Sequence, residues 1–62
     1  MKCKLFLAEG FEELEAVTLI NLLRRAEFQV DTVSISDKRE VAGSKGITIV
    51  ADRVFAKENF SD

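Results

Sequence analysis

Two glutamates near the start of the chain are the residues best placed to do acid–base chemistry. Glu12 and Glu15 are three residues apart in the stretch Ala8–Glu15, directly after a short apolar run. If this stretch begins a helix, the two carboxylates lie on adjacent parts of one face, where such a pair can donate and accept protons. Acidic residues are also common at helix starts without any such role, since the helix dipole favours negative charge there.

Glu15 fits this second explanation less easily. At about 3.6 residues per turn, it shares a stripe with Leu19, Leu22 and Ala26 that is otherwise apolar. A carboxylate on the face that packs on a sheet is costly unless it is paired or protonated. One turn into a helix after the first strand, Glu15 would also lie at the carboxyl end of the sheet, where open α/β folds place their sites. The alternative is that it lies at the margin of the buried arc and reaches solvent.

The other candidates for chemistry are few. Lys45 lies in the loop Gly43–Gly46 and could meet an anion, although a lysine in such a loop is more often only solvated. The chain has no histidine and one cysteine, which excludes a Ser-His or Cys-His pair and an internal disulfide and argues against a zinc site. Cys3, early in a strand, is expected to be a small buried hydrophobe. The loop after the first apolar run holds one glycine, so it is no dinucleotide or phosphate loop, and we expect no metal and no cofactor.

Composition narrows the class of protein further. A net charge of −2 and a pI near 5.0, with no basic stripe, argue against a nucleic-acid binder. We find neither an apolar run that could span a bilayer nor a signal peptide, so a cytoplasmic, reducing setting is the default expectation. A chain of 62 residues with 47% hydrophobic residues has more apolar surface than a lone helix and hairpin can hide, so it looks like part of something larger.

The sequence predicts an α/β arrangement to position these residues. Lys2–Ala8 is predicted as a strand buried on both faces, Phe11–Ala26 as a helix, and Phe28–Ile35 as a second strand rich in β-formers. Gly10 can adopt the backbone angles that the reversal from strand to helix requires. The short joints predict a right-handed crossover, with the two strands parallel and adjacent.

The second half of the chain predicts smaller elements. Two short apolar pieces within residues 40–50 flank a loop of four residues that contains glycine, which favours a small hairpin. Asp52–Phe55 is predicted to cap and begin one helical turn, with Val54 and Phe55 packing inward.

The stretch Leu5–Ala16, with its Gly-Phe-Glu-Glu-Leu-Glu core, resembles the opening of the ThiJ/PfpI family, the superfamily that includes the parkinsonism-associated protein deglycase. Further matches follow in order at Leu22–Ala26, Val30–Ser34, Gly43–Ile47 and Ala51–Asp52. The resemblance implies that residues 1–62 are the N-terminal portion of a single flavodoxin-like domain, a parallel-sheet sandwich related to class I glutamine amidotransferase domains. This chain departs from the family at Glu27, where a glycine often ends the helix, and at Lys45, where arginine or histidine also occurs.

The family resemblance also implies a class of function. Members use a cysteine on a strand-to-helix elbow, attended by a glutamate from the first helix; Glu15 matches that glutamate, and Cys3 does not match the cysteine. Our first hypothesis is therefore a cysteine-dependent hydrolase or lyase of small carbonyl compounds or glycated groups, with its nucleophile outside this chain. The second is a non-catalytic oxidative-stress sensor or chaperone of the same family. The third is a standalone interaction module.

The resemblance assigns expected roles to the remaining site residues. Family members are usually homodimers, and Leu14 and Val17 on the first helix are expected at the dimer interface. Gly10 belongs to the loop beside the site, and Lys45 is expected near Glu12 of a neighbouring subunit. Glu15 is expected to hold its proton and to donate a hydrogen bond to the cysteine sulfur. In this chain alone, we expect its carboxyl group to be either buried without a partner or exposed for lack of its cover.

Overall fold

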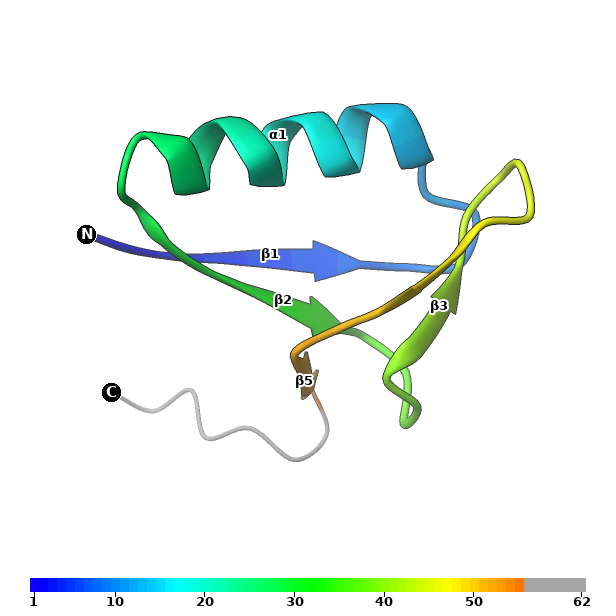
Figure 1. Cartoon of the computed structure of the whole chain (residues 1–62). Helices are drawn as coiled ribbons and strands as arrows, with labels where there is room; N and C mark the ends of the chain where they lie inside the picture. The colour runs from blue at the N-terminus through cyan, green and yellow to red at the C-terminus, as the bar shows by residue number, and fades with distance from the viewer. Residues whose placement is uncertain (56–62) are drawn as a thin grey trace.

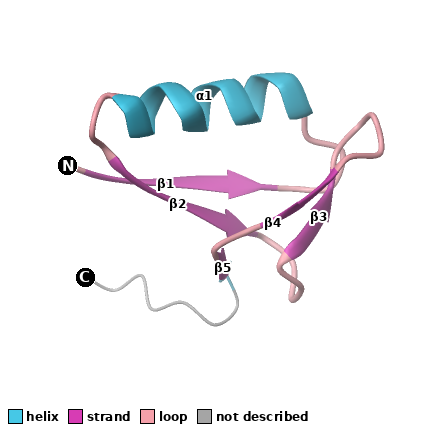
Figure 2. Ribbon diagram, in the orientation of Figure 1, coloured by secondary structure: helices cyan, strands magenta, loops and turns pink. Residues whose placement is uncertain are grey.

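Residues 1–55 are described by a computed structural model, in which one helix lies across one face of a parallel sheet (Figure 1). Its elements, in chain order, are β1 (Lys2–Leu7), α1 (Glu13–Arg25), β2 (Gln29–Ser34), β3 (Glu40–Ala42), β4 (Thr48–Val50) and β5 (Arg53–Val54). Strands β1, β2 and β5 form the sheet in that order, and β3 pairs with β4 in a separate hairpin (Figure 2). The hairpin stands near the carboxyl end of β1, where the chain turns into α1 (Figure 1).

The predicted crossover and hairpin are confirmed. Strands β1 and β2 pair in parallel over their whole length, from Lys2 opposite Gln29 to Leu7 opposite Ser34. The hairpin strands pair antiparallel within residues 40–50. Since α1 connects two adjacent parallel strands across one face of the sheet, this part of the chain is an α/β unit of the predicted kind.

The residues after the hairpin correct the prediction. Instead of a helical turn at Asp52–Phe55, Arg53–Val54 form β5, which pairs in parallel with β2. The reason lies in Asp52, whose carboxylate does not cap a helix but accepts a hydrogen bond from the N–H of Thr32 in β2 at 2.9 Å. This contact holds the following residues beside that strand.

The helix packs on the sheet with a different stripe from the one predicted. Its buried and half-buried residues are Glu13, Ala16, Ile20 and Leu23. The predicted stripe through Glu15 is exposed, with Leu19 44% and Leu22 57% accessible. Both stripes have helical spacing and carry apolar residues, so periodicity alone did not distinguish the packed side from the open one.

Two glutamates mark the ends of α1. Glu12 is the N-cap residue, and its carboxylate accepts a hydrogen bond from the N–H of Leu14 at 3.3 Å. After the last turn, Glu27 adopts a positive φ of 68°, a conformation that usually belongs to glycine. The helix begins at Glu13, two residues later than predicted, because Glu12 is its N-cap residue and not part of the helix.

The core of the described residues ties the hairpin to the start of the helix. One cluster of it has the buried residues Leu7, Val41 and Ala51, against which Phe11, Ala16 and Ile49 pack. Val54 is buried, as predicted. Phe55, also predicted to pack inward, is 48% exposed, and its ring instead meets that of Phe6 edge-on with the ring centroids 6.0 Å apart.

Candidate functional site

The connection between β1 and α1, residues 8–12, is the centre of the candidate site and is called the elbow below. It lies at the carboxyl end of β1, where parallel α/β sheets place their ligands. Gly10 has a φ of 85°, and a Cβ at this position would meet no atom within 4 Å, so the glycine serves the turn and not a close contact. Its N–H donates to the carbonyl of Ala42 in the hairpin at 2.8 Å.

Glu15 is exposed, which is the second of the two expected outcomes. It lines an open hollow of about 220 Å³ together with Glu12. The rest of the lining is mainly apolar and comes from β1, the elbow and α1: Leu5, Phe6, Leu7, Phe11, Ala16 and Leu19. The structure therefore brings the two candidate carboxylates to the lining of one open hollow, beside a strand that forms the edge of the sheet in residues 1–55.

Glu13 is the buried acid of the first turn, with only 5% of its surface exposed. Its Oε2 accepts hydrogen bonds from the N–H groups of Lys45 at 2.7 Å and Ile47 at 3.1 Å, and its Oε1 accepts one from the hydroxyl of Ser44 at 3.3 Å. Burial raises the pKa of this carboxyl, but hydrogen bonds from its own N–H and from these loop groups outweigh that effect and hold the pKa below its ordinary value of 4.5. Glu13 is therefore a charged anchor for the hairpin.

Lys45 lies exposed in the hairpin loop, residues 43–47. Its backbone N–H, and not its ammonium group, is what the structure brings to a first-helix carboxylate, and that carboxylate belongs to Glu13. The predicted pairing with Glu12 concerns a neighbouring subunit and stays a prediction.

Leu14 and Val17, the predicted interface residues, both lie exposed on α1, at 75% and 51%. Leu14 also lines a second open hollow of about 460 Å³ on the helix, together with Glu15, Thr18, Leu19 and Leu22. The lining of this hollow is mainly apolar, so a broad surface of the helix is without cover in the described residues.

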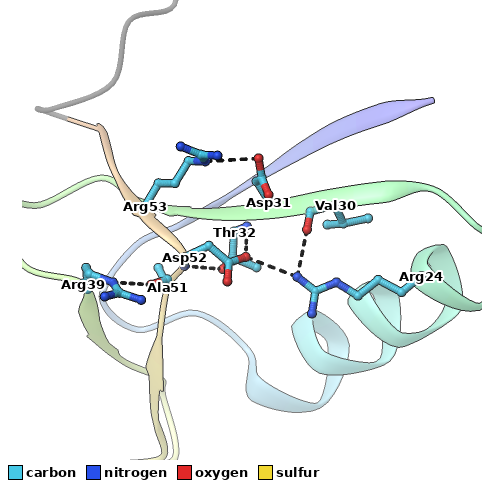
Figure 3. A network of polar contacts seen from close by, with 8 residues as sticks. All are labelled: Arg24, Val30, Asp31, Thr32, Arg39, Ala51, Asp52 and Arg53. Atoms are coloured by element: carbon cyan, nitrogen blue, oxygen red, sulfur yellow. Dashed lines mark hydrogen bonds and ion pairs between the residues drawn. The ribbon is translucent and has the colours of Figure 1, made fainter.

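A polar network near the C-terminal end of α1 joins the helix to the central strand β2 and to the start of β5 (Figure 3). Asp52 Oδ2 accepts hydrogen bonds from the N–H and hydroxyl of Thr32 at 2.9 and 3.1 Å, and from Arg24 Nη2 at 3.2 Å. The same Arg24 nitrogen donates to the carbonyl of Val30 at 2.8 Å. The Thr32 N–H, its hydroxyl and the Arg24 charge hold the pKa of Asp52 below its ordinary value of 3.8, although burial opposes them. These contacts join α1, β2 and the residue before β5 to one another, so the network stabilises the sheet and is no candidate site.

Sequence reasoning missed Glu13 because it looks like any helix-start acid. The available signal was its spacing from Ala16, Ile20 and Leu23, which places it at the head of the stripe that proves to be buried. Within residues 1–55, no three His, Cys, Asp or Glu side chains gather as a metal site would require. No helix of the same residues is long and apolar enough to cross a membrane.

Known proteins resemble this chain in both sequence and fold. The chain is 39% identical over 46 residues to protein DJ-1 homolog B of Arabidopsis thaliana, which covers 74% of the chain and 10% of that relative. A cysteine-to-alanine mutant of a DJ-1 superfamily protein from Salmonella typhimurium matches with a TM-score of 0.90 and 33% identity, over 97% of this chain and 32% of that one. Oxidized DJ-1 of Toxoplasma gondii matches with a TM-score of 0.85 and 36% identity, over 89% of this chain and 30% of that one.

The chain thus spans about a tenth of the length of the first curated relative and about a third of the solved structures. The solved relatives have flavodoxin-like folds, to which the parallel sheet and helix described above correspond. The DJ-1/PfpI family as a whole matches residues 1–62. This chain belongs to the DJ-1/PfpI family.

Proposed function

We propose that residues 1–62 are the N-terminal part of one α/β domain, and that the full-length protein is a cysteine-dependent hydrolase or lyase of small carbonyl compounds or glycated groups. The solved relatives are about three times as long as this chain, which supports a domain that continues after it. In the Salmonella relative, the replaced cysteine has a position number higher than the 62 residues of this chain. The nucleophile is therefore proposed downstream.

The observation that carries the proposal is the position of Glu15. Glu15 lies beside β1, which is an edge strand within residues 1–55, and lines the open hollow described above. A further strand that pairs with the free edge of β1 would end next to Glu15, because parallel strands end at the same edge of a sheet. The sulfur of a cysteine just after that strand would lie in the hollow, within reach of the Glu15 carboxyl group.

In this arrangement, Glu15 acts on the sulfur. A protonated carboxyl donates a hydrogen bond to the thiolate, which stabilises the charged form and lowers the pKa of the thiol. The thiolate then forms a bond from sulfur to the carbonyl carbon of the substrate, and the π electron pair moves to the carbonyl oxygen, which takes up a proton from solvent to give a thiohemiacetal. Glu12, at the same hollow, is a proposed second carboxylate for substrate or partner contacts.

The proposed assembly is a homodimer in the cytoplasm, where thiols are kept reduced. Leu14 and Val17 supply exposed apolar surface for a second subunit. Lys45 is proposed to reach Glu12 of that subunit from the exposed hairpin loop. Since exposed ion pairs contribute only about 0–1 kcal/mol, the effect of Lys45→Ala on the dimerisation constant is expected to be small.

Turnover of methylglyoxal by the full-length protein tests the proposed function. We expect activity in the wild type, part of it in Glu15→Gln, and a loss of about tenfold or more in kcat for Glu15→Leu, since leucine cannot donate a hydrogen bond. Glu40→Gln, an exposed acid in β3, is the matched control and is expected to keep full activity. Absence of turnover on methylglyoxal and on glycated amines in the wild type would refute the enzyme proposal.

A sensor of oxidation is the second candidate, because the Toxoplasma relative was solved in an oxidized form. The same low-pKa cysteine would then be oxidised instead of turning over. Under this alternative, the wild type shows no turnover, peroxide adds oxygen mass to the downstream cysteine, and Glu15→Leu slows that oxidation.

A further inference from the structure

One carboxylate joins the start of α1 to the hairpin loop. Glu13 lies at the first position of the helix, and the donors that it binds are 31–34 residues away in the sequence. The side chain is 95% withdrawn from solvent, and its two oxygens share three donors from Ser44, Lys45 and Ile47. A hydrogen bond to a charged acceptor is shorter and stronger than one between neutral groups, so these contacts hold the loop firmly.

Backbone hydrogen bonds also join the elbow to the hairpin beside this carboxylate. Gly10 N–H donates to the carbonyl of Ala42, and Ser44 N–H donates to the carbonyl of Phe11, both at 2.8 Å. The N–H of Ala42 donates in turn to Oε2 of Glu9 at 3.2 Å. The elbow and the hairpin loop therefore run side by side, with Glu13 at the end of the row nearest the helix.

The loop is also shaped to receive the carboxylate. A Cβ on Gly43 would overlap the Cγ, Cδ and Oε2 atoms of Glu13, so only glycine lets the loop backbone approach this closely. A residue at position 43 and a carboxylate at position 13 are thus fitted to each other, although neither faces the hollow that Glu15 lines.

We infer that Glu13 is the positioning residue of the site. Its hydrogen bonds to Ser44, Lys45 and Ile47, called the clasp below, hold the hairpin loop against the elbow and thereby fix the first turn of α1. Glu12 and Glu15 project from that same turn, and the N–H of Ala16 bonds to the carbonyl of Glu12 at 2.9 Å. Loosening the clasp frees the elbow, and the two carboxylates at the hollow then lose their fixed geometry. The catalytic consequence rests on the proposed function, whereas the mechanical one does not.

Amide hydrogen exchange in the full-length protein, resolved by NMR, tests the mechanical part. For Glu13→Ala we expect exchange to accelerate about tenfold or more at Lys45 and Ile47, and also at Gly10 and Ala16, whose partners are untouched by the substitution. Glu13→Gln keeps one acceptor oxygen and can donate to the Ser44 hydroxyl, so we expect exchange at the same amides to accelerate only about threefold. Glu40→Ala, in the same hairpin, is the control and is expected to change none of them.

The pattern of exchange decides the inference. Unchanged exchange at Lys45 and Ile47 in Glu13→Ala would overturn the clasp, and acceleration there with none at Gly10 and Ala16 would overturn its action on the elbow. Should Glu13→Ala fail to fold, Glu13→Gln decides by the same criteria, with about threefold as the expected effect.

Kinetics on methylglyoxal then test the catalytic consequence. We expect Glu13→Ala to lower kcat about tenfold with little change in KM, and Glu13→Gln to recover most of it, because a misplaced carboxylate affects the chemical step more than binding. If the wild type turns over and kcat is unchanged in Glu13→Ala despite faster exchange, the positioning role is refuted. If the wild type has no activity, the proposed function fails, and the exchange data alone still decide the clasp.

Discussion

Replacement of Glu27 by glycine is expected to stabilise the protein, because Glu27 has a left-handed backbone conformation that strains an L-residue. Its φ is 68°, and the two hydrogen bonds that end α1 depend on it. The N–H of Glu27 donates to the carbonyl of Arg24, and the N–H of Phe28 donates to that of Leu23, each at 3.0 Å. This pair of bonds is a Schellman motif, in which glycine is the usual residue at the left-handed position.

The expected gain follows from two opposing terms. The left-handed conformation costs an L-residue about 1–2 kcal/mol, while glycine loses about 0.5–1 kcal/mol more conformational entropy on folding than alanine. Glu27→Gly should therefore be about 0.5–1 kcal/mol more stable than Glu27→Ala. The alanine variant is the matched control, because both substitutions remove a negative charge that the end of the helix dipole disfavours.

Urea denaturation followed by circular dichroism measures the difference in the full-length protein. All variants are compared at one protein concentration, since the unfolding midpoint of the proposed dimer would depend on concentration. We expect an order of stability of glycine, then alanine, then wild type, with unchanged m-values. If Glu27→Ala proves as stable as Glu27→Gly, the gain comes from charge, and the conformational argument is wrong.

Three further predictions concern the polar anchors. Asp52→Ala should destabilise the protein by about 1–2 kcal/mol, because the buried N–H of Thr32 loses its acceptor, while the half-exposed ion pair of Asp52 adds little. Asp31→Ala, which breaks a partly exposed ion pair with Arg53, should cost less in the same urea titration. Gly43→Ala should cost about 1–3 kcal/mol in thermal unfolding, because its methyl group overlaps Glu13; an unchanged Tm would show that the loop yields freely. Glu13 and Asp52 both have lowered pKa values, so their stabilisation is fully present above the ordinary values of 4.5 and 3.8 and is lost as the pH falls through the lower folded values. Acid titrations of Glu13→Gln and Asp52→Asn should each show a shallower loss than the wild type, and equal slopes would contradict this.

The crossover was predictable because its signals are local. Lys2–Ala8 and Phe28–Ile35 are short, rich in β-formers and separated by one helix-length segment with short joints, which leaves few topologies open. The structure shortens the first strand by one residue at its C-terminal end and the second by one residue at each end. The hairpin was predictable on the same basis, from two short apolar pieces around a loop with glycine.

The packed side of α1 was not predictable from spacing. The stripe headed by Glu15 and the stripe headed by Glu13 both run through apolar residues, and a helix that is apolar on two sides has no single preferred face. Contacts with distant residues decided between them, since the carboxylate of Glu13 finds three donors in the hairpin loop. The same limit applies to Asp52, which resembles a helix cap in the sequence but bonds to Thr32, 20 residues earlier.

For the candidate site, the sequence identified Glu12 and Glu15, and the structure places both at one hollow. The role of Glu15 came from family resemblance, because spacing alone left a surface acid equally possible. Its exposure follows from the free edge of β1 in the described residues, and the group proposed to cover it lies outside this chain.

The pKa of the downstream cysteine in the full-length protein tests the central claim most directly. It is measured from the pH dependence of alkylation in the wild type, Glu15→Gln and Glu15→Leu, with Glu40→Gln as control. We expect a lowered thiol pKa in the wild type and in the control. Glu15→Gln should keep most of that lowering, because glutamine still donates a hydrogen bond. Glu15→Leu should raise the thiol pKa by about one unit or more, because leucine cannot donate one. A thiol pKa that is the same with leucine as with glutamate would contradict the central claim and leave Glu15 as a helix-start acid only.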